Sequence, residues 1–172
     1  MNSDILNYPL SRNLSVKLIG QFIGHEGINI YKIERENGVA LDIWRDETDE
    51  SFVRITGPYW NLKMALNDVC LLVSEIRNNN REYNFVIPTK DVGFLIGKNG
   101  AKINEIKLSS GVDVHFDKGG DGEDSKVIVT GNYQTILTGL RLVFDRFNSK
   151  GQKSLYENPR TRQFAEAVME SF

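Results

Sequence analysis

The chain has 172 residues, a formal net charge of −2 and a sequence pI of about 5.7. Hydrophobic residues make up 40% and charged residues 26% of it, which is typical of a folded chain rather than a disordered one. The slightly acidic balance argues against a long basic surface for polyanions. No apolar run reaches the roughly 18 residues of a membrane span, so we expect no membrane association. Residues 1–8 lack the basic start and apolar run of a signal peptide.

Cysteine and histidine are scarce in this sequence. The single cysteine, Cys70, excludes an internal disulfide and a multi-cysteine metal site, and the two histidines are too few for a His-rich one. We therefore expect no metal and no cofactor. A free cysteine without a disulfide partner favours a reducing compartment, cytoplasm or nucleus, and no Lys/Arg cluster decides between these two.

An internal repeat organises the chain. Residues 24–43 and 97–116 align at an offset of 73 residues, whereas 55–57 and 129–131 align at 74, so one residue is added in the loop between them. The identical pairs are Gly24/Gly97, Gly27/Gly100, Ile30/Ile103, Ile33/Ile106, Gly38/Gly111 and Val39/Val112.

The first repeat predicts a strand near Asn13, a short helix running into Ile23 and a second helix that carries Ile30 and Ile33. A strand over 39–44, an acidic loop over 45–51 and a strand over 52–56 follow. A long helix then begins with Pro58, a favoured first helical residue. Its apolar stripe consists of Leu62, Leu66, Val69, Cys70 and Val73. Cys70 is predicted to lie in the core because it aligns with Phe144.

The second repeat predicts the same order. The expected elements are a strand over 83–87, helices over 91–96 and 101–108, a strand over 112–116, a polar loop over 117–125, a strand over 126–130 and a helix over 133–147. The expected division is an N-terminal extension 1–10, a first module 11–77, a linker 78–82, a second module 83–148 and a tail 149–172. The tail is predicted to contain an amphipathic helix with Phe164, Ala165, Val168 and Met169 on one side.

Both repeats contain an Ile-Gly-x-x-Gly-x-x-Ile element between two short helices, FLIGKNGAKINEI at 94–106 and QFIGHEGINIYKI at 21–33. This element within a βααββα order resembles the K-homology (KH) domain of the type I, eukaryotic arrangement, over about residues 11–148. The resemblance implies an α+β fold of two tandem modules, each a three-stranded antiparallel sheet packed on three helices, plus the C-terminal helix. It also implies binding of single-stranded RNA, in post-transcriptional regulation or RNA processing, through a GxxG loop that clamps about four nucleotides.

The residues of the second loop suit that role on physical grounds. Gly97 and Gly100 permit close backbone approach, and the helix that starts near Ala101 directs free N–H groups at the loop. Ile96 and Ile103 are expected to support an apolar groove floor, and His115 to face outward from the following strand. The predicted RNA-binding residues of this module are Ile96, Gly97, Lys98, Asn99, Gly100, Lys102, Ile103, Val114 and His115.

The first loop differs in charge. His25 and Glu26 stand where the second loop has Lys98 and Asn99, and Glu26 would repel a phosphate. Either this loop contacts RNA, or its module is a degenerate copy retained as a packing scaffold. The corresponding candidate residues are Ile23, Gly24, His25, Glu26, Gly27 and Ile30. Trp44, on the nearby strand, is expected to pack against a neighbouring element rather than to stack on a base.

Three other functions were weighed. No Ser/His/Asp set, GxxxxGK[ST] loop or HExxH motif occurs, so the chain is not expected to be an enzyme. A protein-interaction or ribonucleoprotein assembly scaffold that has lost RNA binding is the main alternative, favoured by the acidic pI and Glu26. Single-stranded DNA is a further alternative, because the loop mechanism alone does not require a 2′-hydroxyl. The tail helix is a candidate site for a protein partner or self-association.

Overall fold

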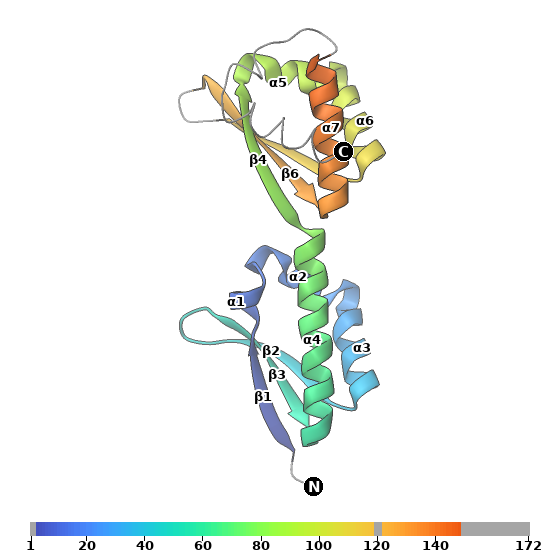
Figure 1. The fold of residues 1–172 in the computed structure, drawn as a ribbon. Helices are drawn as coiled ribbons and strands as arrows, with labels where there is room; N and C mark the ends of the chain where they lie inside the picture. Colours follow the sequence, from blue (N-terminus) through green and yellow to red (C-terminus); the bar gives the residue numbers. More distant parts are fainter. Residues whose placement is uncertain (1–2, 119–121, 149–172) are drawn as a thin grey trace. The chain divides into compact units, whose positions relative to one another are not determined.

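The computed structural model describes residues 3–118 and 122–148. It divides into two compact units with the boundary between Arg77 and Asn78, and each unit has its own sheet and its own hydrophobic core (Figure 1). The helix predicted within 149–172 lies outside the described residues.

The first unit has the order strand, helices, two strands and long helix. Its strands form one antiparallel sheet in the order β1-β3-β2, so β2 is an edge strand. Its elements are β1 (Asp4–Pro9), α1 (Leu10–Asn13), η1 (Val16–Leu18), α2 (Ile19–Ile23), η2 (His25–Gly27), α3 (Ile28–Asn37), β2 (Ala40–Arg45), β3 (Ser51–Gly57) and α4 (Tyr59–Asn79).

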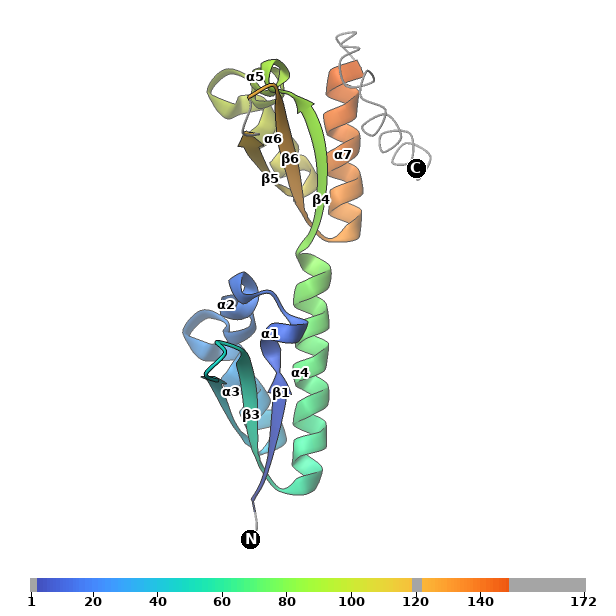
Figure 2. The same ribbon diagram turned by 90° about the vertical axis from the view of Figure 1, so that its left-hand side faces the viewer.

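The second unit repeats this order without the extra short helices that follow β1 in the first unit. Its antiparallel sheet has the order β4-β6-β5, and α6 and α7 lie side by side (Figures 1 and 2). Its elements are β4 (Arg81–Pro88), α5 (Thr89–Ile96), η3 (Lys98–Gly100), α6 (Ala101–Ser110), β5 (Asp113–Lys118), β6 (Asp124–Gly131) and α7 (Tyr133–Asn148). Residues 78–82, expected as a linker, thus include the end of α4 and the start of β4.

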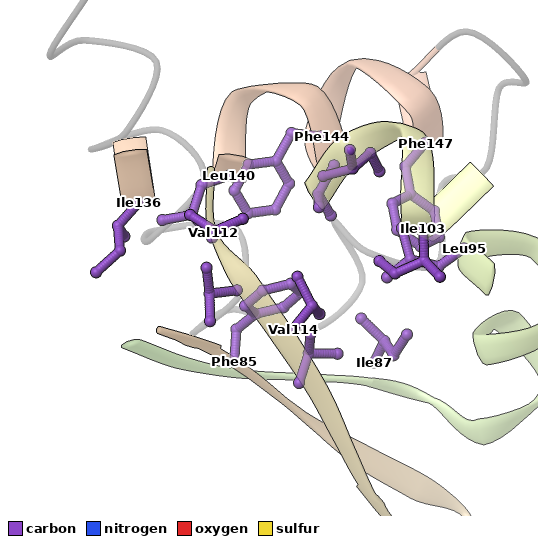
Figure 3. Packing of buried hydrophobic residues seen from close by; sticks show 14 residues of the cluster. Phe85, Ile87, Leu95, Ile103, Val112, Val114, Ile136, Leu140, Phe144 and Phe147 are labelled. Carbon is purple, nitrogen blue, oxygen red and sulfur yellow. The ribbon is translucent and has the colours of Figure 1, made fainter. Parts of the chain in front are cut away.

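The core of the second unit lies between its sheet and its helices. Strand residues Phe85, Ile87 and Val114 extend toward helix residues such as Leu95 and Phe144 (Figure 3). The strands alternate between buried and exposed residues, as the period of two requires, and the helices contribute one apolar face each. Ile103 and Ile106 of α6 are both buried, as the repeat predicts.

The position of the first strand differs from the position predicted from the sequence. The sequence predicts it near Asn13 and treats 1–10 as an extension, but β1 spans Asp4–Pro9 and pairs with β3 from Asp4↔Gly57 to Pro9↔Phe52. The constant offset fails here because the first unit contains additional residues between its first strand and its glycine loop. Pro9 lies 15 positions before Gly24, whereas Pro88 lies nine positions before Gly97.

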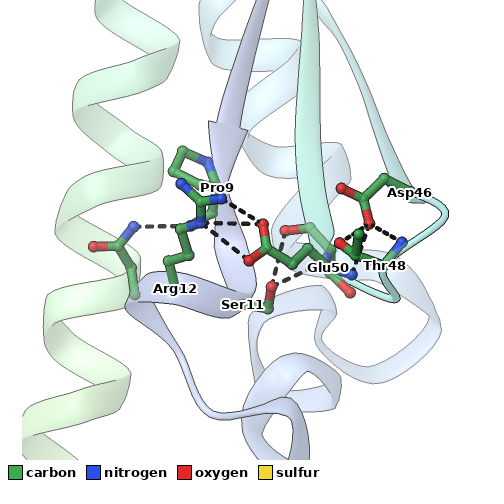
Figure 4. Close-up of polar contacts among 8 residues, drawn as sticks. Pro9, Ser11, Arg12, Asp46, Thr48 and Glu50 are labelled. Carbon is green, nitrogen blue, oxygen red and sulfur yellow. Dashed lines mark hydrogen bonds and ion pairs between the residues drawn. The ribbon is translucent and has the colours of Figure 1, made fainter.

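The added segment is tied to the acidic loop that follows β2 (Figure 4). The Arg12 guanidinium of α1 contacts both carboxylate oxygens of Glu50, with Nη2 2.8 Å from Oε2, and the Ser51 amide donates to Ser11 Oγ at 2.9 Å. Within the loop, Asp46 Oδ1 accepts hydrogen bonds from Thr48 Oγ1 and from the Thr48 and Glu50 amides. These bonds, led by that from the Thr48 hydroxyl, lower the pKa of Asp46. The predicted acidic loop is therefore a turn that these hydrogen bonds hold in place.

The long helix α4 also differs in detail. Pro58 precedes its first residue, and the Leu62 amide donates to the Pro58 carbonyl at 3.1 Å. Leu66 and Cys70 are only half-buried. Burial raises the pKa of the Tyr8 hydroxyl, and a hydrogen bond with the Cys70 thiol raises it further. The buried stripe consists of Leu62, Ala65, Val69, Val73 and Ile76. It is shifted around the helix by part of a turn relative to the predicted stripe.

Candidate nucleic-acid interface

The glycine loop of the second unit joins α5 to α6 through a tight left-handed turn. Gly97 has φ 74° and ψ 176°, a region open essentially to glycine alone. Asn99 (φ 52°) and Gly100 (φ 76°) are both left-handed, and the Gly100 amide donates to the Gly97 carbonyl at 3.2 Å. The chain then enters α6 directly at Ala101. The side chains of Lys98 and Asn99 are exposed at this turn, next to the free N–H groups of the helix N-terminus.

The loop of the first unit has the same backbone geometry. Gly24 has φ 79° and ψ 168°, Glu26 has φ 52° and Gly27 has φ 78°. The Gly27 amide donates to the Gly24 carbonyl at 3.1 Å, as in the second unit. Asn29 Nδ2 donates to the Gln21 carbonyl at 3.0 Å and so braces α3 against α2. The two loops thus differ in side-chain chemistry and not in conformation.

An open groove of about 560 Å³ runs beside the first loop, between α3 and the edge strand β2. Across it, Glu34 Oε1 accepts a hydrogen bond of 2.8 Å from the Leu41 amide, which faces away from β3. We call this cavity the first groove; it is lined by Ile23, Glu26, Gly27, Ile30, Tyr31, Glu34, Leu41, Asp42 and Ile43.

Each residue that lines the first groove has an equivalent in the second unit, 73 residues later in the chain. We call this set the second face; it consists of Ile96, Asn99, Gly100, Ile103, Asn104, Lys107, Val114, His115 and Phe116. The acidic positions of the first groove, Glu26, Glu34 and Asp42, are here replaced by neutral or basic residues. The second face therefore lacks the three carboxylates of the first groove, on an equivalent backbone.

Asp113 organises the basic side chains of the second face. Lys107 Nζ lies 2.9 Å from Asp113 Oδ1, and His115 Nε2 lies 2.9 Å from Asp113 Oδ2. The Val114 amide donates to the same carboxylate at 3.0 Å. The hydrogen bond from Lys107 is the main cause of the lowered pKa of Asp113. One carboxylate thus holds a lysine and an exposed histidine beside the edge strand β5.

Replacing Asp113 with Asn is expected to destabilise the second unit at neutral pH but less in acid. Folding lowers the pKa of the Asp113 carboxyl, so the carboxylate makes its full contribution to stability above the unfolded-state pKa of about 3.9. That contribution is lost as the pH falls through the folded-state pKa. Urea unfolding of both proteins at about pH 7 and about pH 3 measures the difference, which should shrink at the lower pH. A difference that is equal at both pH values would contradict the proposed charge interaction.

The predicted site residues fall into three groups by exposure. Lys98, Asn99, Lys102, His115, His25 and Glu26 are exposed; Ile96, Gly97, Gly100, Ile23, Gly24, Gly27 and Ile30 are half-buried; Ile103 and Val114 are buried. Lys102 Nζ lies 3.3 Å from Glu105 Oε2, a solvent-exposed pair of small expected energy. Ile103 and Val114 belong to the hydrophobic core, which agrees with the supporting position that the sequence predicts for Ile103.

Trp44 packs against its own unit, as expected from the sequence. Its ring stacks on Phe52 with 5.0 Å between centroids, the Arg54 guanidinium lies 5.2 Å from its centroid, and Nε1 donates to Asn7 Oδ1 at 3.3 Å. The Trp44 ring is therefore packed against residues of its own unit.

Sequence reasoning missed several residues that line the first groove or belong to the second face. Tyr31 and Glu34 follow Gly27 and Ile30 by one helical turn, and Lys107 follows Ile103 in the same way. The helical spacing of i and i+4 would have placed them on the same side as the glycine loop. The Asp113 side chain is 54% exposed, and the sequence pattern does not predict its bond to Lys107.

Each unit combines a three-stranded antiparallel sheet, helices on that sheet and a Gly-x-x-Gly turn between the first two helices, and this combination defines a type I KH module. The sequence pattern of the KH domain family matches residues 12–70 and 82–145. The chain belongs to the KH domain family, as a tandem of two type I modules.

Two curated proteins are similar to the chain in sequence. The chain is 32% identical to human vigilin over 123 residues, which are 69% of this chain and 10% of vigilin. It is 29% identical to Protein SCP160 of Saccharomyces cerevisiae over 126 residues, 73% of this chain and 10% of that protein. The chain thus spans about a tenth of the length of the curated relatives it matches.

Solved structures match the chain at lower sequence identity. A structure of KH domains has a TM-score of 0.34 and 18% identity, and covers 69% of this chain and 36% of its own. The a/eIF2alpha–aDim2p–rRNA complex from Pyrococcus horikoshii OT3 has a TM-score of 0.31 and 17% identity, with 99% and 96% covered. Among residues 3–118 and 122–148, no helix is long and apolar enough to cross a membrane. The same residues contain no group of three His, Cys, Asp or Glu placed to hold a metal.

Proposed function

We propose that the chain binds single-stranded RNA and that the second module is the principal reader. KH modules commonly recognise single-stranded RNA in a sequence-specific way, and their glycine loop clamps the backbone of about four nucleotides. The observation that carries the proposal is the exposed Lys98–Asn99 tip on a left-handed turn at the start of α6. Lys98 has no ion-pair partner among the described residues, so its charge is available to a phosphate.

The geometry supports distinct roles for the parts of the second face. Gly97 and Gly100 permit the sugar-phosphate backbone to approach, and the N–H groups at the start of α6 favour its negative charge. Lys98 and Lys102 supply positive charge at the loop. Ile96 provides apolar surface for bases.

Base edges meet the opposite side of the second face. The outward backbone groups of β5 and the imidazole of His115, held by Asp113, provide donors and acceptors there. Ile103 and Val114 act from beneath, by supporting this surface and, for Val114, through the backbone. The cellular role that this chemistry suits is post-transcriptional regulation or RNA processing.

The first module is expected to contribute less to phosphate binding. Its candidate residues Ile23, Gly24, His25, Gly27 and Ile30 keep the loop and the apolar floor. Glu26, however, places a negative charge where the second loop has a neutral amide. A phosphate at that tip would be repelled by about 1 kcal/mol at contact distance even in water.

The test compares wild type, the double variant Lys98→Asp/Asn99→Asp and the single variant His25→Asp. Binding to random-sequence single-stranded RNA of about ten nucleotides, longer than the footprint of about four, is measured by fluorescence anisotropy. The second-loop variant is expected to bind about tenfold or more weakly, because two carboxylates then face the phosphates. His25→Asp is expected to change the affinity less than about threefold. Aspartate tolerates the left-handed conformation of Asn99, so the fold should be retained, which circular dichroism checks.

Other outcomes separate the alternatives. Equal losses in both variants would make both loops RNA contacts. Absence of RNA binding by wild type would overturn the proposal and favour the assembly scaffold. Equal or tighter binding of DNA of the same sequence would instead assign the loops to single-stranded DNA.

A further inference from the structure

The first groove has the wrong charge for a nucleic acid. Its lining includes the carboxylates of Glu26, Glu34 and Asp42 and no lysine, arginine or histidine. The corresponding positions of the second face are Asn99, Lys107 and His115. A polyanion that enters the first groove would pass these carboxylates, and the described residues that line the groove include no basic residue to offset Glu26 and Glu34, whereas Asp42 is paired in register with Arg54 of β3. The cavity therefore fits a cationic ligand.

The rest of the lining narrows the chemistry of that ligand. Ile23, Ile30 and Ile43 give the groove an apolar, half-buried floor, and Tyr31 is 67% exposed along α3. Glu34 is held in place at the rim by the Leu41 amide, which occupies one acceptor site of its carboxylate and leaves others. An arginine side chain matches this combination, because its guanidinium is weakly hydrated, stacks on aromatic rings and bonds carboxylates bidentately.

The edge strand provides the means to hold a polypeptide backbone. Among the residues that the structure describes, β2 pairs only with β3, so every second residue along it directs its backbone N–H and C=O away from the sheet. Leu41 is such a residue, since its amide bonds to Glu34, and the alternation makes Ile43 the next. Extended peptides commonly bind by adding main-chain hydrogen bonds to an exposed strand edge of this kind.

We propose that the first groove binds an extended, arginine-containing peptide segment of a partner protein. The peptide backbone lies along the β2 edge at Ile43, arginine side chains meet Glu26, Glu34 and Asp42, and one guanidinium stacks on Tyr31. This inference goes beyond RNA binding by the second module and does not depend on it. It would make the chain an adaptor, with a polyanion on one module and a basic polypeptide on the other.

The probe is a fluorescein-labelled peptide of alternating glycine and arginine, about ten residues long, titrated with the full chain and measured by fluorescence anisotropy. A peptide with lysine in place of arginine is the chemical control and is expected to bind several-fold more weakly, because lysine cannot bond bidentately or stack as well. The groove variant is Glu26→Asn/Glu34→Gln/Asp42→Asn. Glutamine keeps the acceptor for the Leu41 amide, and asparagine is the residue that the second loop carries at the same left-handed position.

A matched variant removes the same number of charges outside the groove. Glu36, Glu47 and Glu75 are exposed residues of the same unit and are not part of the groove lining, and all three are changed to Gln. The groove variant is expected to bind the arginine peptide about tenfold or more weakly than wild type, and the matched variant within about twofold. Equal losses in both would show non-specific attraction and overturn the proposal.

Two further arms separate this inference from the proposed function. The Lys98→Asp/Asn99→Asp chain is expected to bind the arginine peptide as wild type does, even though its RNA binding is lost. Labelled single-stranded RNA is expected to bind the groove variant no more weakly than wild type. Weaker RNA binding by the groove variant would assign the first groove to RNA and overturn the peptide proposal, whatever the second loop does.

Discussion

Replacing Ile103 with Asn is expected to unfold the second module while leaving the first folded. Ile103 is 7% exposed and belongs to the core of the second module (Figure 3). The substitution removes an apolar side chain and buries an amide without partners, for a combined cost of about 4 kcal/mol or more. Small domains have a free energy of unfolding of only about 5–15 kcal/mol, so the loss is a large part of the total.

Urea unfolding of the full chain measures the loss of stability. Amide NMR spectra, in which the two modules give separate signals, show which module has unfolded. Resonances of residues 83–148 should lose their dispersion, whereas those of the first module should stay. Ile103→Val serves as the control, because it keeps the apolar surface and costs only about 1 kcal/mol. The equivalent Ile30 is half-buried, so Ile30→Asn is expected to cost less than Ile103→Asn. A well-dispersed Ile103→Asn spectrum would contradict the assignment of this residue to the core.

Most of the fold follows from two features of the sequence. The offset of 73 residues aligns the glycine loops, and periods of two and 3.6 place strands and helices around them. These patterns locate α5, α6, β5, β6 and α7 within a few residues. They work because each module has a core of its own, so that local periodicity and burial agree.

The misplaced first strand shows where this reasoning fails. A repeat offset carries no information across an insertion, and the segment from Leu10 to Ser15 has no counterpart in the second module. What fixes β1 is its register with β3 and the Arg12–Glu50 contact, both of which join residues far apart in sequence. Neither is visible to a pattern that considers only neighbours along the chain.

The candidate site was predicted in outline but not in its charges. The loops at Gly24 and Gly97 follow from the motif, yet the acidic character of the first groove depends on Glu34 and Asp42, which come from two different elements. Likewise, Lys107 and Asp113 meet across the junction of α6 and β5. Such pairings require the tertiary structure, and the ligand proposed for each module depends on them.

Replacing Gly97 with Ala is expected to destabilise the second module by about 2–4 kcal/mol, whereas Gly93→Ala in the preceding helix is expected to stabilise it by up to about 1 kcal/mol. A Cβ at Gly97 would lie 2.6 Å from Lys102 Cγ and 3.1 Å from the Lys102 backbone nitrogen. The φ of 74° with ψ of 176° is in addition unfavourable for any side chain. Gly93 has no atom within 4 Å of its added Cβ, so alanine there only restricts the unfolded chain.

The first module supplies the matched pair, Gly24→Ala and Gly20→Ala. Gly24 has the same backbone strain as Gly97, and its added Cβ would lie 2.8 Å from Asn29 Nδ2 and 2.9 Å from Ile28 Cγ2. Asn29 Nδ2 donates to the Gln21 carbonyl, so this side chain cannot move aside without losing that bond. Gly24→Ala is therefore expected to destabilise the first module about as much as Gly97→Ala destabilises the second. Thermal unfolding of all four variants ranks them, with Gly93→Ala and Gly20→Ala above wild type. If Gly97→Ala were as stable as Gly93→Ala, the tight turn that places Lys98 at the start of α6 would not be a requirement of this sequence.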